Sequence, residues 1–244
     1  MAVQLIHPVY LSSEEKASTI VKKADEPILS DRMYSISTMI IYRSSNPHPA
    51  MEIETYSMAK KDKYYSLTIH RKPARLKGTA YLITDNDLWV RFASTGRVRK
   101  LSSSARENSA GGSDFSYNDM GESGKGMAAN YSSKLLSSRA SVNGRKCYKI
   151  ELNKQDSHYE KIVVFIDREN YRYLRIDYYK SGANIKTLHF FNYETVNGKN
   201  YPFRLVMESH TKPTKTEIIT KKIELNSPRV KDSLFTTAYL KRIR

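Results

Sequence analysis

Apolar and polar residues alternate along most of this chain, which is the pattern of β-strands that bury one face and expose the other. The alternation begins at Met33 and predicts a first series of strands over residues 33–101 and a second over residues 145–226. Individual strands are expected near residues 51–58, 63–71, 78–84, 87–93 and 97–101, and then near 159–167, 170–180, 183–196, 201–210 and 215–225. Within the second series, Asn197-Gly198 is the strongest hairpin signal in the chain.

The short connections between these strands predict sequential antiparallel neighbours, because a parallel crossover needs a longer connection. About 11 strands are more than an open sheet accommodates comfortably without curling. The expected fold class is therefore mainly β with a few helices, in which a single antiparallel and strongly curved meander forms an unclosed half-barrel. Residues 162–166 are apolar at both parities, which predicts that both faces of that strand are covered.

A helix is predicted over residues 12–27, ahead of the first strand. Ser12 or Ser13 is the expected N-cap, acids follow in the first turn where the helix dipole favours them, and Pro27 ends the run. One side is lined at helical spacing by Ala17, Ile20, Val21 and Ala24. Such a helix needs an apolar surface to pack on.

Residues 102–144 separate the two strand series and are rich in Ser, Gly, Asn and Ala. We expect a loop and helix insert here, with a second short helix over residues 127–136. Within it, residues 112–120 read Gly-Ser-Asp-Phe-Ser-Tyr-Asn-Asp-Met, which predicts a plug or helical insert between two halves of the sheet. Residues 227–244 form a C-terminal tail, and residues 1–244 are expected to be a single domain.

Positive charge dominates the composition, with 41 Lys and Arg against 25 Asp and Glu and a formal net charge of +16. Such a surface attracts phosphates, nucleic acid or anionic lipid headgroups, and charge alone does not choose among them. Cys147 is the one cysteine, so the chain forms no internal disulfide and no cysteine-based zinc cluster. Its strand setting predicts a buried, inert thiol.

The sequence shows neither a membrane span nor an intact leader. No run approaches the roughly 20 apolar residues that cross a bilayer. Met1 to Tyr10 has no charged start and no apolar stretch of sufficient length for a signal peptide. Either the protein is cytoplasmic, or this is a mature form whose leader has been removed.

No catalytic residue, metal site or cofactor is predicted. Residues 121–126 superficially suggest a phosphate-binding loop but lack its first glycine and its Ser or Thr, so they are interpreted as a solvated turn. There is no nucleophile elbow, and the six histidines are scattered without metal-ligand spacing. Asp114 and Asp119 have the residue type of a general acid and base, but beside Ser and Asn they are more typical of caps and turns.

A basic β module that binds nucleic acid or another polyanion is the alternative function. Seven Lys and Arg residues cluster between positions 60 and 77, and the 18 tyrosines offer stacking faces. Against this, most tyrosines fall at strand positions, where they are ordinary β-formers, and no nucleic-acid-binding motif is present.

The stretch at residues 112–120 also carries a resemblance to a known family. Together with Asp87-Leu88-Trp89-Val90 before it and an ending at Asp232-Ser233-Leu234-Phe235-Thr236, it resembles the outer-membrane lipoprotein-sorting proteins of the LolA-like superfamily. The similarity extends over almost the whole chain and includes the N-terminal helix, the two strand series and the insert between them. The insert is its most specific part.

The resemblance implies a non-enzymatic periplasmic carrier, an unclosed β-barrel whose concave apolar face is lidded by helices and shelters acyl chains. It implies an exported precursor, either free in the periplasm or tethered to the membrane as a lipoprotein. Its partners would be lipoprotein acyl chains, a phospholipid or a fatty acid, and a membrane-embedded export or acceptor protein in transient contact, with no nucleic acid. The family's carriers latch the lid with an Arg-Pro, where this chain has Lys60-Lys61-Asp62-Lys63-Tyr64.

Three sets of site residues follow from this interpretation. The cavity wall takes apolar positions of one parity in long strands, namely Met39, Ile41, Tyr65, Leu67, Ile69, Trp89, Leu174, Ile176, Leu188 and Phe190. The lid takes Ile20, Val21, Phe115, Tyr117 and Met120, with Ser113, Asp114 and Asp119 capping the turn that holds them. A basic rim for anionic headgroups takes Lys60, Lys61 and Lys63. Each wall residue is equally consistent with plain core, since the sequence does not tell which parity faces the cavity.

Overall fold

One antiparallel sheet of 14 strands organises the computed structural model, which describes residues 15–27, 32–60, 63–85, 87–122, 126–155 and 157–243. The strands are β1 (Arg32–Arg43), β2 (Asn46–Pro47), β3 (Met51–Lys60), β4 (Lys63–Lys72), β5 (Ala80–Thr84), β6 (Asp87–Arg91), β7 (Val98–Lys100), β8 (Ser132–Val142), β9 (Arg145–Asn153), β10 (Lys161–Asp167), β11 (Tyr173–Lys180), β12 (Ala183–Val196), β13 (Lys199–Ser209) and β14 (Thr214–Leu225). The helices of these residues are α1 (Ala17–Asp25), α2 (Tyr117–Glu122) and α3 (Thr237–Arg242), with short 3-10 turns η1 (Ala74–Leu76), η2 (Ser104–Glu107) and η3 (Asp232–Leu234).

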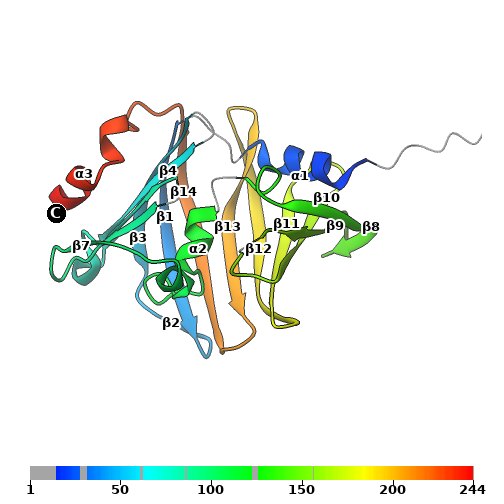
Figure 1. Cartoon of the computed structure of the whole chain (residues 1–244), viewed down its shortest axis with the longest axis horizontal. Coiled ribbons are helices and arrows are strands. Elements are labelled where there is room, and N and C mark those ends of the chain that lie inside the picture. Colours follow the sequence, from blue (N-terminus) through cyan, green and yellow to red (C-terminus); the bar gives the residue numbers. More distant parts are fainter. Residues whose placement is uncertain are drawn as a thin grey trace, which may run out of the picture.

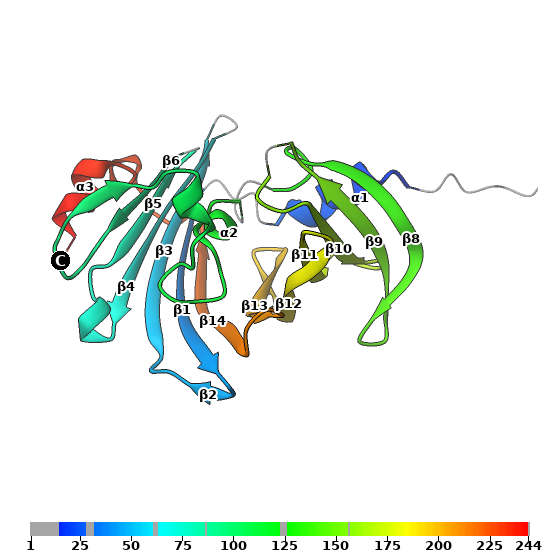
Figure 2. The same ribbon diagram turned by 60° about the horizontal axis from the view of Figure 1, so that its bottom comes forward.

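The first strand of the chain, β1, lies in the middle of the sheet, because it pairs with β3 on one side and with the last strand, β14, on the other. The order is β7-β6-β5-β4-β3-β1-β14-β13-β12-β11-β10-β9-β8, with β2 pairing β1. We call β1 and β3 to β7 the first arm, and β8 to β14 the second arm. Figure 2 shows the sheet strongly curved, with α2 in the space between the ribbons of the two arms, and we call this space the hollow. The edge strands β7 and β8 do not pair with each other, so the predicted open, curved half-barrel is confirmed.

The segment that joins the arms, residues 101–131, is called the insert. It connects β7 to β8, which are the opposite edges of the sheet, and must therefore cross from one arm to the other. In Figures 1 and 2 its helix α2 lies between the arms, whereas α3 lies beyond the first arm. We call the face covered by α1 and the insert the inner face, and the opposite face the outer face.

Residues 127–136 do not form the predicted second helix. They make one turn at Met127 and then enter β8, which pairs with β9. The Met, Ala, Lys and Leu content favours a helix locally, but the ladder to β9 supplies backbone partners that override this preference. The second strand series accordingly begins at Ser132 rather than near residue 145, and the sheet has more strands than predicted.

Two local predictions are confirmed. Asn197 and Gly198 join β12 to β13 with φ angles of 47° and 77°, as a two-residue hairpin turn of type I′ requires. In β10, all residues from Ile162 to Ile166 are buried, so both faces of that strand are covered.

The helix α1 covers an apolar cluster on the inner face of the second arm. Directly paired positions of four adjacent strands form the centre of this cluster, namely Val164, Ile176, Leu188 and Met207. From α1, Ile20, Val21 and Ala24 close it and are at most 4% exposed. The apolar side predicted for the helix is thus its buried side, although the predicted N-cap residues Ser12 and Ser13 lie outside the described residues.

The C-terminal segment, residues 227–243, covers the outer face of the first arm. An apolar cluster joins Val230, Phe235, Leu240 and Ile243 of this segment to strand residues that include Leu67, Ile69 and Leu82. Asp232 pairs with Arg32 at 2.5 Å and with Lys60 at 2.7 Å. The predicted tail is therefore a packed part of the fold.

Truncation of Leu240 tests how firmly this segment is docked. Leu240 is fully buried, so Leu240→Ala leaves a cavity and is expected to lower the free energy of unfolding by about 2–5 kcal/mol. Chemical denaturation followed by circular dichroism measures the change. Leu136→Ala is the control, because Leu136 is 42% exposed on the edge strand β8 and its loss is expected to cost less than about 1 kcal/mol. Equal costs for the two variants would contradict the docking.

Candidate functional site

The insert bridges the two arms with apolar and aromatic side chains. Phe115 packs against the cluster that α1 covers on the second arm. Tyr117 and Met120, in α2, pack on the first arm against Tyr81 and its neighbours, and the ring centres of Tyr81 and Tyr117 are 5.5 Å apart. The three predicted lid residues of the insert therefore lie on the inner face, one on the second arm and two on the first.

Asp114 ties the insert to β14, the strand at the centre of the sheet. Its carboxylate accepts hydrogen bonds from the hydroxyls of Thr214 and Thr216, at 2.5 and 2.7 Å. Its backbone N–H donates to Thr216 Oγ1 at 2.9 Å. Thr216 is fully buried, so its hydroxyl needs hydrogen-bond partners within the protein. Asp114 supplies both, because the hydroxyl donates to its carboxylate and accepts from its backbone N–H.

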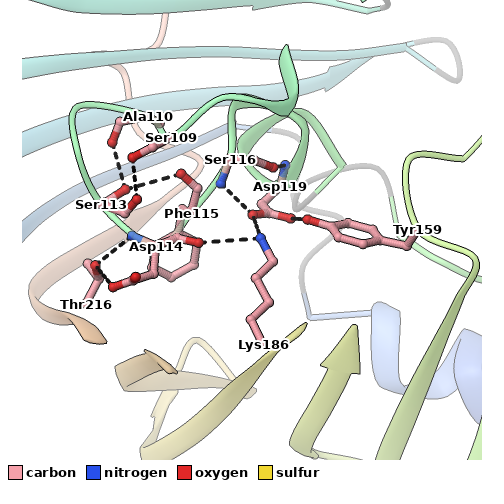
Figure 3. A network of polar contacts seen from close by, with 10 residues as sticks. All are labelled: Ser109, Ala110, Ser113, Asp114, Phe115, Ser116, Asp119, Tyr159, Lys186 and Thr216. Carbon is pink, nitrogen blue, oxygen red and sulfur yellow. Dashed lines mark hydrogen bonds and ion pairs between the residues drawn. The ribbon is translucent and has the colours of Figure 1, made fainter. Parts of the chain in front are cut away.

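Asp119 ties the insert to the second arm (Figure 3). Its carboxylate accepts hydrogen bonds from the Ser116 backbone N–H and from the Tyr159 hydroxyl, both at 2.6 Å. The Asp119 N–H donates to Ser116 Oγ at 3.1 Å, so the two residues cap the start of α2 reciprocally. The ammonium group of Lys186, from β12, forms an ion pair with the same carboxylate. Asp114 and Asp119 thus both have structural partners, as their setting in the sequence favoured.

The ion pair between Lys186 and Asp119 is buried, with the two residues 8% and 9% exposed. The Lys186 ammonium also lies 5.2 Å from the ring centre of Tyr159 and 5.1 Å from that of Tyr178, within the range of cation–π attraction. Burial, and next the Asp119 charge, raise the pKa of Tyr159, so its hydroxyl stays a donor. Because desolvation offsets most of the attraction in such a pair, the pair mainly determines where the insert sits.

A second polar link joins α1 to the end of the insert. Asp25 is 2% exposed and accepts hydrogen bonds from the N–H groups of Met127 and Ala128, at 2.7 and 2.8 Å, and from the Tyr173 hydroxyl at 2.7 Å. Burial raises the pKa of Asp25 in spite of these donors. Gly126 has a φ of +72° and a Cβ there would lie 3.1 Å from Asp25 Oδ2, so glycine is required for this close approach.

Two cavities flank the insert in the part of the chain that the structure describes. One, of about 240 Å³, lies between the insert and the first arm and is lined by Ile41, Arg43, His48, Pro49, Met51, Arg75, Leu76 and Gly111. The other, of about 350 Å³, lies between the insert and the second arm near Lys186 and Tyr159. Both are at or below the lower end of the usual range for ligand pockets, about 300–1,000 Å³. The insert and α1 therefore fill much of the hollow.

The ten predicted wall residues do not share one face. Five lie on the inner face, namely Met39, Ile41, Ile176, Leu188 and Phe190. The other five lie on the outer face, with Tyr65, Leu67, Ile69 and Trp89 under the C-terminal segment and Leu174 on the second arm.

The physical reasons for this division differ between the arms. The first arm buries apolar side chains on both faces, so its alternation does not distinguish inner from outer positions. In β11 a bulge opposite Phe165 and Ile166 adds one residue, so that Tyr173 shares the face of Ile176 and Leu174 does not.

The remaining predicted site residues are placed as follows. Ile20 and Val21 of α1 are fully buried on the inner face. Of the three rim lysines, Lys60 is paired with Asp232 of the C-terminal segment, Lys63 is exposed at the start of β4, and Lys61 lies outside the described residues.

Some of the basic residues and tyrosines that suggested polyanion binding form ion pairs or are buried within the protein. In the basic cluster, Lys60, Arg71 and Lys72 pair with Asp232, Glu54 and Glu52. Several tyrosines are core residues with less than a tenth of their surface exposed, namely Tyr34, Tyr81, Tyr159, Tyr173, Tyr178 and Tyr201. These rings are not available for stacking on bases.

The described ranges of the chain contain neither a cluster of metal ligands nor a membrane-spanning helix. No group of three or more His, Cys, Asp or Glu side chains there could hold a metal ion, and no helix there is long and apolar enough to cross a bilayer. Cys147 is fully buried, as predicted, and burial raises the pKa of its thiol.

Sequence reasoning missed Lys186, Tyr159 and Asp25. Lys186 lies in a strand stretch that includes Ile185 and Leu188, and a lysine in such a stretch is a signal of a buried, paired charge. Its partner Asp119 is 67 residues away, however, so the sequence gives no means of pairing the two. For Asp25, the last residue of an amphipathic helix, no signal distinguished burial from exposure.

The chain matches one family model in sequence and several solved structures in fold. A family model described only as an uncharacterized protein matches residues 62–242. No protein of curated function matches the chain in sequence.

Three crystal structures share the fold over nearly the whole chain. A DUF1329 family protein from Desulfovibrio piger is 25% identical, with a TM-score of 0.85, over 92% of this chain and 97% of that one. A putative outer membrane lipoprotein-sorting protein domain from Vibrio parahaemolyticus is 25% identical, with a TM-score of 0.83, over 93% and 100%. A LolA superfamily protein from Nitrosomonas europaea is 22% identical, with a TM-score of 0.74, over 92% and 99%. The resemblance drawn from the sequence is confirmed.

Removal of the buried cation tests the link between the insert and β12. Lys186→Met leaves the Asp119 carboxylate buried without its counter-charge and is expected to lower the free energy of unfolding by about 3–5 kcal/mol. Adding Asp119→Asn to this variant is expected to recover part of the loss, because the amide carries no charge, its oxygen can still accept from the Ser116 N–H, and its NH2 group can donate to the Tyr159 hydroxyl oxygen. Urea denaturation measures both variants.

The matched control is an exposed ion pair of the same type. Lys100 and Asp87 are 2.8 Å apart with side chains 49% and 41% exposed, so Lys100→Met is expected to cost less than about 1 kcal/mol. An Asp119→Asn double variant less stable than Lys186→Met alone would contradict the proposed source of the cost.

Asp25 is expected to contribute a pH dependence of known sign. Since its pKa in the folded protein is raised above the ordinary 3.8, the folded state binds the proton more tightly than the unfolded state does. The contribution of Asp25 to the free energy of unfolding is therefore greatest below pH 3.8, and it is lost as the pH rises through the raised pKa. The difference in unfolding free energy between the native protein and Asp25→Asn, measured from acid to neutral pH, should fall. A difference that grows with pH would show that the three hydrogen bonds outweigh burial.

Proposed function

The chain belongs to the family of uncharacterized proteins whose model spans residues 62–242, and on the strength of its fold and its site we propose that it is a non-enzymatic carrier of acyl chains. The observation that carries this proposal is the inner face of the second arm. It is an apolar surface covered by α1 and the insert, two segments outside the sheet, and not by further strands. The similarity to a putative lipoprotein-sorting domain supports the same function.

The attachment of these covers favours movement. Within residues 112–120 of the insert, Phe115 packs on the second arm, and Asp114 and Asp119 add hydrogen bonds and an ion pair. Elsewhere in the insert, Met127, Ala128 and Tyr131 pack on the same cluster, and Glu107 pairs with His158 and Lys180. Polar groups of this kind exchange protein partners for water at small net cost, because water replaces each hydrogen bond. Displacing residues 112–120 therefore sacrifices mainly the burial of Phe115, Tyr117 and Met120.

Burial of an acyl chain can offset the free energy lost when these side chains are exposed. Each methylene shielded from water contributes about 0.8 kcal/mol, so a chain of about 15 methylenes gains roughly 12 kcal/mol in a dry site. Ligand and insert then compete for the same apolar surface. Return of Phe115 and α1 to that surface would favour release of the cargo at an acceptor.

The proposed setting is the bacterial envelope. The carrier would work in the periplasm as an exported protein, taking the acyl chains of a lipoprotein or lipid from one membrane-embedded partner and delivering them to another. No cofactor is required, because the transfer makes and breaks no covalent bond.

A reversible disulfide between the insert and β14 tests whether the insert must move. The Asp114 nitrogen lies 2.9 Å from Thr216 Oγ1, so Asp114→Cys with Thr216→Cys, in a Cys147→Ala background, places two thiols side by side. The oxidised protein is expected to bind a fluorescent fatty acid at least about tenfold more weakly than the reduced protein. Fluorescence titration with and without reductant measures this, and native mass spectrometry of gently purified protein identifies bound lipid.

The control disulfide staples the insert to itself. Ser109 and Ser116 are antiparallel bridge partners within the insert, so cysteines at these positions restrain it without tying it to the sheet. Binding by this variant should not depend on reductant. Equal binding by the oxidised and reduced forms of the Asp114–Thr216 variant would show that acyl chains enter without displacing the insert.

A further inference from the structure

We propose that the cavity between the insert and the first arm is a headgroup site, in which Arg43 and Arg75 bind the carboxylate or phosphate of an anionic amphiphile. The proposal deepens the carrier function and rests on it, because it names the class of lipid. It would make the cargo a fatty acid or an anionic phospholipid whose charged end is held at the first arm.

Two arginines from separate elements converge on this cavity. Arg43 is the last residue of β1, Arg75 belongs to η1, and His48 follows the short strand β2. A planar guanidinium presents several N–H donors in a fork that matches the two oxygens of a carboxylate or phosphate. Two such forks at one cavity provide more donors than a single carbonyl or hydroxyl would use.

These cations form no ion pair within the part of the chain that the structure describes. No acidic residue lines the cavity, and among the described residues neither Arg43 nor Arg75 forms a side-chain hydrogen bond or an ion pair. Other basic side chains of the same arm do find partners, as Arg71 does with Glu54 at 2.6 Å. Arg43 also borders the second cavity, but that cavity has two acids, Glu107 and Asp114, in its lining beside Lys186. The first cavity is therefore the one suited to an external anion.

Apolar side chains continue from the cations into the hollow. Ile41 and Met51 line the cavity and belong, with Met39 and Ile53, to a buried cluster on the inner face against which Leu76 and Ile218 pack. Methionine adapts readily to irregular apolar partners. A ligand held here by its charged end would lay its first methylenes along Ile41 and Met51.

The insert forms the roof of this cavity. Gly111 is part of the lining, and a Cβ placed on Gly112 would lie 3.8 Å from an Nη of Arg43. The present volume of about 240 Å³ suits a headgroup and the start of a chain, but not a whole lipid. Displacement of the insert, which the carrier function already requires, would open the rest of the path.

The test compares probes that share a chain but differ in charge. A dansyl-labelled undecanoic acid and its methyl ester are titrated into the full chain at low and high salt, with inorganic phosphate as competitor. The acid is expected to bind at least about tenfold more tightly than the ester, as a charge-assisted hydrogen bond provides, and this advantage should shrink with salt. In the variant Arg43→Gln/Arg75→Gln, the acid should bind no better than the ester does.

A charge-matched variant controls for the loss of net charge. Arg97 and Arg99 are exposed near the edge strand β7, away from the cavity, so Arg97→Gln/Arg99→Gln should keep the preference for the acid. Each double variant removes two positive charges, but only Arg43 and Arg75 line the cavity. Thermal unfolding of both variants checks that each remains folded.

The outcomes separate this proposal from the carrier function. Equal binding of acid and ester by the native protein overturns the headgroup site and leaves the carrier function standing. Binding of neither probe overturns both. Inhibition by phosphate at concentrations as low as those at which the labelled acid binds would mean that the acyl chain adds no affinity, which identifies a site for free anions and overturns the lipid headgroup.

Discussion

The antiparallel pairing of β1 with β14 is the constraint on which the rest of this structure depends. It joins the first strand to the last, from Met33 opposite Leu225 to Arg43 opposite Thr214. Because these strands meet in the middle, the free edges are β7 and β8, at the far ends of the sheet. The chain must then cross the hollow between them, and the crossing segment becomes the cover of the inner face.

The inner face combines apolar surfaces with few, well-defined polar attachments. Asp114, Asp119 and Asp25 each accept several hydrogen bonds, and each connects segments that are distant in sequence. Buried polar groups that find all their partners specify one arrangement, because any displacement leaves them unsatisfied. The same groups are readily hydrated once exposed, so a cover attached in this way can be both well positioned and removable.

The two arms divide the tasks of stability and binding. On the first arm the C-terminal segment covers the outer face, while the inner face carries the cluster around Met39 and Met51 beside Arg43 and Arg75, which form no ion pair with any described residue. On the second arm α1 lies on the inner face over Val164 and its neighbours. A charge-bearing site and an apolar site therefore lie on the same face, one on each arm, with the insert between them.

The sequence by itself determined the strands, the hairpin at Asn197-Gly198, the amphipathic helix and the family resemblance of residues 112–120. These depend on periodicity, turn residues and motifs, which are local properties of the chain. Only the tertiary structure decided that residues 132–142 are a strand, that Leu67 and Trp89 face the C-terminal segment, and that Lys186 meets Asp119. Strand pairing, the covering of a face and the partner of a buried charge arise from contacts between segments far apart in sequence, and a pattern of period two is the same whichever face is covered.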